Sequence, residues 1–327
     1  MNTNIGMTGE FRCVVKKSDG SIKTDTGYQK NLILNQGLDF FGGGGEGFDM
    51  MEYCVIGSGN SQPSYTQNKL DITVATAWGA RYSTKYDYDV ARDGNLYKTN
   101  KVSKYSFTGL NNVNISELGL ASSYIDETTY FLCTRALIKD SQGNPTTITV
   151  LNGEILEIYY KLWVVYDTTD KTGTLNLLDG VGGSTAYNYI ARLAGVGGTN
   201  IGGSAEYGVS TVGLALSPGA GNNDHFIANG EIGAITEAPT GTEAEWISSS
   251  SVSTATYIHG SYMRQLTWSL SISEANFASR SFLFLTSMGF YQIRFGSVAD
   301  DSPIIKTDTQ TLSIPIEVSW GRYEGAL

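Results

Sequence analysis

The chain has 327 residues and a formal charge of −10, with 17% of its residues charged, 20 Tyr and 39 Gly. This composition suits short strands joined by Gly-rich turns, so an all-β protein is predicted, and the length allows two domains of ordinary size. The negative charge argues against a protein whose main task is to hold nucleic acid, since that requires clustered Lys and Arg. No apolar run is long enough to cross a membrane and the N-terminus lacks a signal-peptide pattern, so no membrane insertion is expected.

Residues 1–167 are predicted to form an N-terminal β module. An Asp-Gly pair at residues 19–20 predicts a tight hairpin near its start, because Gly adopts the positive φ of a two-residue turn without strain. Apolar residues at helical spacing in residues 31–41 predict one short helix, with Asn31 as its N-cap. A second Asp-Gly hairpin is expected at residues 93–94.

Residues 168–327 are predicted to form a C-terminal β module with Gly-rich loops. In its last strand four apolar residues alternate with polar ones, which predicts one buried face: Leu312, Ile314, Ile316 and Val318. A second alternating strand is expected to bury Leu266, Trp268, Leu270 and Ile272. The strands that end at Trp163 and Trp320 resemble each other, so we expect two separate β-sandwich-like modules with these strands in comparable positions.

Two patterns resemble parts of known chemical sites but have a plainer structural interpretation. Gly42, Gly44 and Gly47 have the spacing of a dinucleotide-binding loop, but that loop follows a strand and opens a helix, whereas here the expected helix comes first. His225 and His259 stand alone, without the partners of a catalytic triad or a metal site, so structural or surface roles are favoured. The three cysteines are far apart and odd in number, which predicts reduced thiols rather than a disulfide framework.

Acidic side chains offer oxygens that calcium or a glycosidase mechanism would use. Asp87 and Asp89, or the acidic end of residues 222–224, could hold Ca²⁺, but neither carries the spacing of a dedicated calcium loop. The pair at residues 300–301 precedes a proline and is better explained as a solvated turn. No catalytic residue, cofactor or metal site is therefore predicted.

One aromatic patch is the best candidate for an interaction surface. Tyr82, Tyr86 and Tyr88 fall on one face of an expected strand, and the partner strand carries Tyr97 and Tyr105 together with several lysines. Aromatic rings among basic groups can stack on bases or sugars. Because nearby aspartates dilute the positive charge and Tyr is common in strands, a pairing face or subunit contact is favoured.

Several blocks of the chain resemble recurring segments of tailed-bacteriophage virion proteins. They are residues 30–39, 55–63, 115–120, 135–150, 291–293 and 306–312. The resemblance implies a non-enzymatic component of a phage tail, tail sheath, neck or appendage, and it defines no functional residue. The segment from about 168 to 260 takes no part in it.

The resulting hypothesis is a structural protein that forms a symmetric ring or sheath layer around a phage tail or neck. Its partners would be copies of itself and other tail or neck proteins, and it would reside in the virion after synthesis in the bacterial cytoplasm. The loops between about residues 180 and 233 are expected to contact a neighbouring subunit. The alternative is a tail appendage or fibre that binds a host receptor or surface glycan, while a glycan depolymerase is disfavoured because no catalytic constellation is visible.

Overall fold

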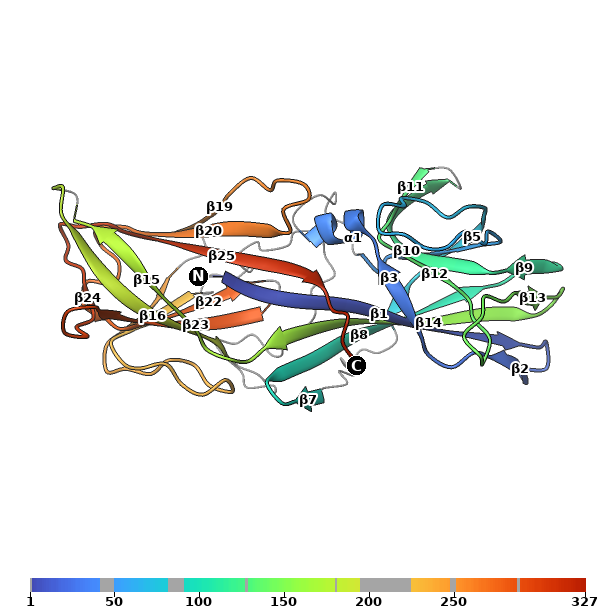
Figure 1. The fold of residues 1–327 in the computed structure, drawn as a ribbon, viewed down its shortest axis with the longest axis horizontal. Coiled ribbons are helices and arrows are strands. Elements are labelled where there is room, and N and C mark those ends of the chain that lie inside the picture. Colours follow the sequence, from blue (N-terminus) through green and yellow to red (C-terminus); the bar gives the residue numbers. More distant parts are fainter. Residues whose placement is uncertain are drawn as a thin grey trace.

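Three long strands form the spine of the molecule: β1 (Asn2–Lys16), β8 (Leu96–Phe107) and β14 (Ile155–Asp167). The computed structural model describes residues 2–41, 50–81, 91–126, 129–179, 181–194, 225–247, 251–286 and 289–327. Both β1 and β8 pair antiparallel with β14, which therefore lies between them. Figure 1 shows the spine running along the long axis and joining two lobes. The all-β class predicted from the sequence is confirmed.

The N-terminal lobe is a sheet that curls back onto the spine. Its other strands are β2 (Ile22–Asp25), β3 (Gln29–Ile33), β4 (Tyr53–Gly57), β5 (Thr73–Trp78), β6 (Ala80–Arg81), β7 (Ala91–Asp93), β10 (Glu117–Asp126), β11 (Thr129–Leu132) and β12 (Thr134–Leu137). β9 (Val113–Ile115) and β13 (Ile148–Val150) form a separate two-stranded sheet in this lobe. From β1 the pairing runs through β3, β12, β10 and β4 to β5. The chain then passes Gly79 into β6, which pairs with β8. A side chain at Gly79 would approach the Met51 carbonyl oxygen to 2.7 Å, so this passage requires glycine. The enclosed core holds Phe11, Cys54 and Tyr160.

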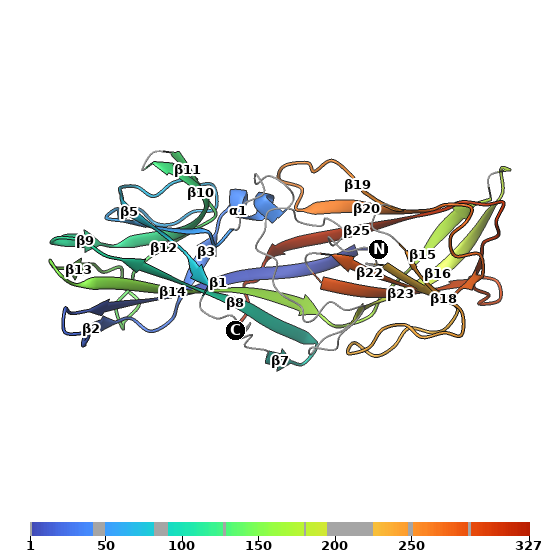
Figure 2. The ribbon, with the colours of Figure 1, turned by 180° about the vertical axis from the view of Figure 1, so that it is seen from behind.

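The C-terminal lobe has two layers, which are visible in Figure 2. One is a six-stranded sheet in the order β15 (Lys171–Leu178), β16 (Ser184–Ala194), β23 (Gly289–Ser297), β22 (Ser281–Thr286), β17 (His225–Ala228) and β18 (Ala244–Ile247). The other contains β19 (Val252–Thr254), β20 (Met263–Leu270) and β25 (Leu312–Arg322), while β21 (Ala278–Ser279) and β24 (Ile304–Ile305) form a small separate pair. Trp268 of β20 packs on Phe282 and Phe284 of β22, with ring centroids 5.5 and 6.1 Å apart. These aromatic contacts join the two layers.

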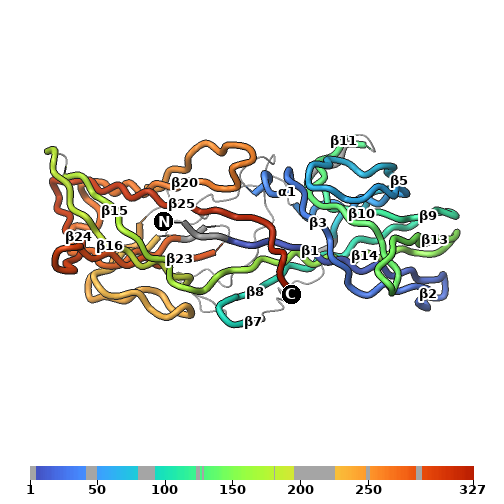
Figure 3. The backbone as a smooth tube through the Cα atoms, in the orientation of Figure 1, coloured from blue at the N-terminus to red at the C-terminus, as the bar shows by residue number. Residues whose placement is uncertain are grey.

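The C-terminal strand returns to the start of the chain. β25 pairs in parallel with β1, from Asn2 opposite Glu317 to Met7 opposite Arg322, so β19, β20 and β25 belong to the same 15-stranded sheet as the N-terminal strands. Figure 3 shows β25 running beside β1. A boundary at residues 167 and 168 therefore does not separate two sheet systems. The strands of Trp163 and Trp320 both flank β1, one antiparallel and one parallel to it, rather than ending two separate sheets.

The local expectations have mixed outcomes. The two Asp-Gly turns form as predicted, with φ of 83° at Gly20 and 57° at Gly94. The buried face of β25 is confirmed, and so is that of β20, except that Ile272 lies beyond the strand and is 55% exposed. The helix α1 (Asn35–Asp39) is shorter than predicted and has Leu34 as its N-cap. Asn31 was wrongly predicted as the cap, because it pairs with the long strand β1 and so belongs to β3. The three cysteines are free and buried.

Candidate functional site

A buried ion pair connects three of the recurring sequence blocks. Glu117 opens β10 and Arg135 lies on β12, and both side chains are fully buried. The Nε and Nη2 atoms of Arg135 donate hydrogen bonds to Oε2 of Glu117 at 2.9 and 2.7 Å. The other oxygen of Glu117 accepts hydrogen bonds from the backbone N–H groups of Gly59 at 3.0 Å and Ile72 at 3.1 Å. The carboxylate therefore ties two neighbouring strands to both ends of one loop.

Asp71 extends this network to the surface. Arg135 Nη2 lies 2.9 Å from Asp71 Oδ2, and Ser61 donates hydrogen bonds to Asp71 from its backbone nitrogen at 2.8 Å and its hydroxyl at 2.7 Å. Burial alone would raise the pKa of Asp71, but the hydrogen bonds from Ser61 and the charge of Arg135 outweigh it and lower the pKa. Every charge in the network thus has an opposite partner. Such an arrangement fixes a loop and leaves no group free for acid–base chemistry.

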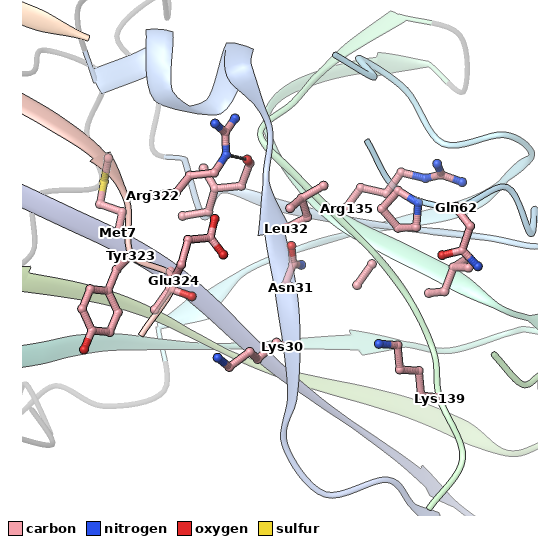
Figure 4. A pocket seen from close by; sticks show the side chains of 15 residues that line it. Met7, Lys30, Asn31, Leu32, Gln62, Arg135, Lys139, Arg322, Tyr323 and Glu324 are labelled. Atoms are coloured by element: carbon pink, nitrogen blue, oxygen red, sulfur yellow. Dashed lines mark hydrogen bonds between the residues drawn. The ribbon is translucent and has the colours of Figure 1, made fainter. Parts of the chain in front are cut away.

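A pocket of about 280 Å³ lies beside this network, between the N-terminal lobe and the C-terminal tail. Figure 4 shows residues of β1, β3 and β12, the loop at Gln62 and the tail after β25 around one hollow. Segments from three of the recurring blocks, residues 30–39, 55–63 and 135–150, line this pocket, and β3 brings two of them together with β1 because it pairs with both β1 and β12. The tail residues from Arg322 to Glu324 complete the wall, since β25 delivers them next to β1.

The pocket carries an excess of positive charge. Lys30 and Lys139 are exposed on its rim, and no carboxylate among the described residues forms an ion pair with either. Among the described residues, Lys30 Nζ donates one hydrogen bond, to the Gly325 carbonyl oxygen at 3.3 Å. Glu324 is the one acidic side chain of the wall, and it accepts a hydrogen bond from the Tyr65 hydroxyl at 3.2 Å.

Arg322 is held rigidly in the wall. Its Nε donates to the Ile33 carbonyl oxygen and its Nη2 to Asn35 Oδ1, both at 2.6 Å, and the first of these bonds is drawn in Figure 4. The guanidinium also lies over the Tyr65 ring, 3.8 Å from its centroid. Burial lowers the pKa of Arg322, yet an arginine stays charged at neutral pH. Its charge therefore contributes to the pocket from a fixed position.

Asn31 is one of the buried polar residues of the pocket, 7% exposed. Its Nδ2 donates to the Thr134 hydroxyl at 3.2 Å, while its Oδ1 has no hydrogen-bond partner among the described residues. No sequence pattern marks Lys30, Lys139 or Arg322 as a site, because they come from segments far apart in the chain. In the sequence, only the recurring blocks relate some of the pocket residues to one another, and those blocks by themselves predict turns and strands.

The predicted tyrosine surface requires a partial correction. Tyr97 and Tyr105 are 4% and 0% exposed and belong to the core, where Tyr105 donates a hydrogen bond to the Met51 carbonyl oxygen at 2.6 Å. Both lie on the inner face of β8, because the sheet curls over that face. Tyr82, Tyr86 and Tyr88 lie outside the described residues, so the surface predicted for them stays a prediction.

The other sequence patterns give no site in the described part of the chain. Gly42, Gly44, Gly47, Asp87, Asp89 and residues 222–224 lie outside it, as do most loop residues between 180 and 233. The pair at residues 300–301 forms an exposed turn, as predicted, and Asp301 is bound to Arg294. His225 is buried against Trp268 and His259 is exposed.

Comparisons with protein-family models, with curated proteins and with solved structures give no match to this chain. Across the described residues there is no group of three or more His, Cys, Asp or Glu side chains placed to hold a metal ion. In the same residues, no helix has the length and apolar character that crossing a membrane requires.

Proposed function

We propose that the chain is a non-enzymatic structural component of a tailed-bacteriophage particle and assembles with copies of itself into a ring or sheath layer around the tail or neck. The resemblance of its sequence blocks to virion proteins supports the phage assignment. The buried Glu117–Arg135 network supports a structural role for those blocks, because their charged groups are used to hold strands and a loop together.

The observation that carries self-assembly is an apolar surface at the end of the C-terminal lobe, which we call the distal tip. Five large apolar residues there are 52–90% exposed: Leu178, Val181, Ile272, Val298 and Ile305. They lie in turns or strand ends far from the N-terminal lobe, at the outer ends of β15, β20, β23 and β24 (Figure 1). Leu178 and Ile305 border the same surface hollow. Exposed apolar clusters of this kind mark protein contacts.

An open sheet edge lies next to the distal tip. Within the described residues β15 pairs only with β16, and its residues alternate between half-buried and exposed. An edge strand of this kind presents backbone N–H and C=O groups to another chain. A neighbouring subunit could therefore use hydrogen bonds along the edge together with apolar burial at the tip. Permanent interfaces commonly bury roughly 2,000 Å² or more in total.

Sedimentation velocity over a concentration series tests the proposal in solution. We expect the wild-type chain to form oligomers and the double variant Leu178→Asp, Ile305→Asp to remain monomeric. The control is Ile22→Asp, which adds one carboxylate at an apolar residue that is 58% exposed in the N-terminal lobe, and it should assemble like the wild type. Equal assembly of the double variant and the wild type would remove the distal tip from the interface.

Cross-linking mass spectrometry of intact phage particles tests the assignment to the virion. The chain should be present in many copies, with cross-links between distal tips or from a distal tip to another tail protein. Absence of the chain from particles would overturn the phage assignment. If the chain is present but the tip gives only links within one chain, the receptor- or glycan-binding appendage becomes the better proposal, and the basic pocket favours that alternative.

A further inference from the structure

We propose that the pocket of Figure 4 binds one unit of an acidic saccharide, with the sugar carboxylate bound at the rim that carries Lys30 and Lys139 and the sugar hydroxyls bound by the neutral polar wall. This inference does not rest on self-assembly, because the pocket lies at the junction of the lobes and the distal tip at the far end of the C-terminal lobe.

The charges of the pocket select an anion. The whole chain carries a net charge of −10, yet this wall carries Lys30, Lys139 and Arg322 against the single carboxylate of Glu324. The charge of Arg135, which also lines the pocket, is already compensated by Glu117 and Asp71. The two lysines are different, since no carboxylate among the described residues pairs with them. Their ammonium groups can therefore form charge-assisted hydrogen bonds with a carboxylate that enters.

Arg322 adds positive charge near the bound anion, but its guanidinium group is not free to bind the anion in a bidentate manner. Its Nε and Nη2 are occupied by Ile33 and Asn35, and its plane is covered by Tyr65 on one side. A free guanidinium fork would favour bidentate binding of phosphate. Here two of its nitrogens are used within the protein, so the mobile ammonium groups of the lysines are the main contacts. This arrangement favours one carboxylate at the rim over a phosphate held deeply by a fork.

The uncharged part of the wall favours a sugar over a bare anion. Thr8, Asn31 and Gln62 line the pocket with residues that carry hydroxyl and amide groups. Donors and acceptors side by side match hydroxyl groups, which both donate and accept. Leu32 and Pro63 add an apolar surface on which the carbon face of a sugar ring can rest.

The size of the pocket limits the ligand. At about 280 Å³ it is at the lower end of ligand pockets, which range from roughly 300 to 1,000 Å³ for drug-sized molecules. One sugar unit fits such a volume, and the open rim leaves room for the glycosidic bonds to neighbouring units.

The class of ligand is tested by titrating the full chain with three probes, namely glucuronate, methyl glucoside and inorganic phosphate. Binding of each probe is measured by NMR. Glucuronate has the glucose ring with a carboxylate in place of the C6 hydroxymethyl group, so we expect it to bind at least about tenfold more tightly than methyl glucoside. It should also bind more tightly than phosphate, because only the sugar uses the neutral wall. Equal binding of the two sugars, glucuronate no better than phosphate, or no binding of glucuronate at millimolar concentration would each overturn the proposal.

Charge reversal locates the site. Lys139→Glu and Lys30→Glu should each weaken glucuronate binding about tenfold or more. Lys17→Glu is the control, because Lys17 is also an exposed lysine, in the turn between β1 and β2, and it should bind like the wild type. Unchanged binding by both pocket variants would overturn the assignment. The distal-tip double variant should bind glucuronate normally, so failure of the self-assembly proposal is distinguishable from failure of this one.

Discussion

His225 is expected to make the C-terminal lobe sensitive to mild acid. It is 1% exposed on β17, lies 5.1 Å from the Trp268 ring, and neither ring nitrogen has a hydrogen-bond partner in the described structure. Burial lowers the pKa of His225 to about 4, because no nearby group compensates the charge of the protonated ring. A fall in pH is therefore expected to destabilise the folded state. The variant His225→Phe removes the titrating group and keeps an aromatic ring next to Trp268.

The direction in which the free energy of unfolding changes with pH follows from the difference in the pKa of His225 between the folded and unfolded states. In the unfolded chain His225 has an ordinary pKa near 6.5, so the unfolded state binds the proton first and stability falls as pH drops from about 6.5 toward about 4. Below that range both states are protonated and the contribution is lost in full. Each unit of pKa difference corresponds to about 1.4 kcal/mol, so the whole loss is roughly 3 kcal/mol, of which about 2 kcal/mol falls between pH 7 and pH 5.

The carboxylates affect the free energy of unfolding at lower pH than His225 does. Burial would raise the pKa of Glu157, but hydrogen bonds from Lys104 and Lys16 outweigh it and lower the pKa to about 2. A carboxylate with a lowered pKa contributes stability above its unfolded pKa, here 4.5, and loses it as pH falls toward 2. The interval from pH 7 to pH 5 therefore reports mainly on His225.

Urea unfolding at pH 7 and pH 5, followed by tryptophan fluorescence, measures the effect. The wild type should lose about 2 kcal/mol between these values, and His225→Phe should lose much less, whatever its absolute stability. His259→Gln removes the exposed histidine and should retain the loss seen in the wild type. If His225→Phe and the wild type lose the same free energy, the buried, unpartnered histidine is not the source of the acid sensitivity.

Two further predictions concern the cores of the two lobes. Glu117→Gln leaves the buried charge of Arg135 without its main partner and should lower the free energy of unfolding by about 3 kcal/mol. The control is Asp25→Asn, at the partly exposed ion pair with Arg12, which should lower the free energy of unfolding by less than about 1 kcal/mol. Urea titrations that give equal losses for the two variants would contradict the burial of the network. Trp268→Ala removes a side chain that is 3% exposed between the two layers of the C-terminal lobe and should lower the free energy of unfolding by about 4 kcal/mol. The control is Trp78→Ala, where the side chain is 62% exposed, and it should change the free energy of unfolding by less than about 1 kcal/mol. A small loss for Trp268→Ala in calorimetry would argue against tight packing of the two layers.

Local patterns in the sequence determined the elements that depend only on neighbouring residues. Alternation of period two set the buried face of β25, since successive side chains of any strand point to opposite sides. The Asp-Gly turns followed from the conformational freedom of Gly20 and Gly94. The all-β class followed from composition, because many Tyr and Gly and few charges suit strands and tight turns.

Tertiary structure decided which faces are inside and which strands meet. The sequence could not show that β25 pairs with β1, about 310 residues away along the chain, because strand pairing depends on the whole fold. Tertiary packing also made Tyr97 and Tyr105 core residues, since the face of β8 that they share is covered only when the sheet curls. The pocket likewise depends on β3 joining β1 and β12, which brings together residues that no local pattern relates.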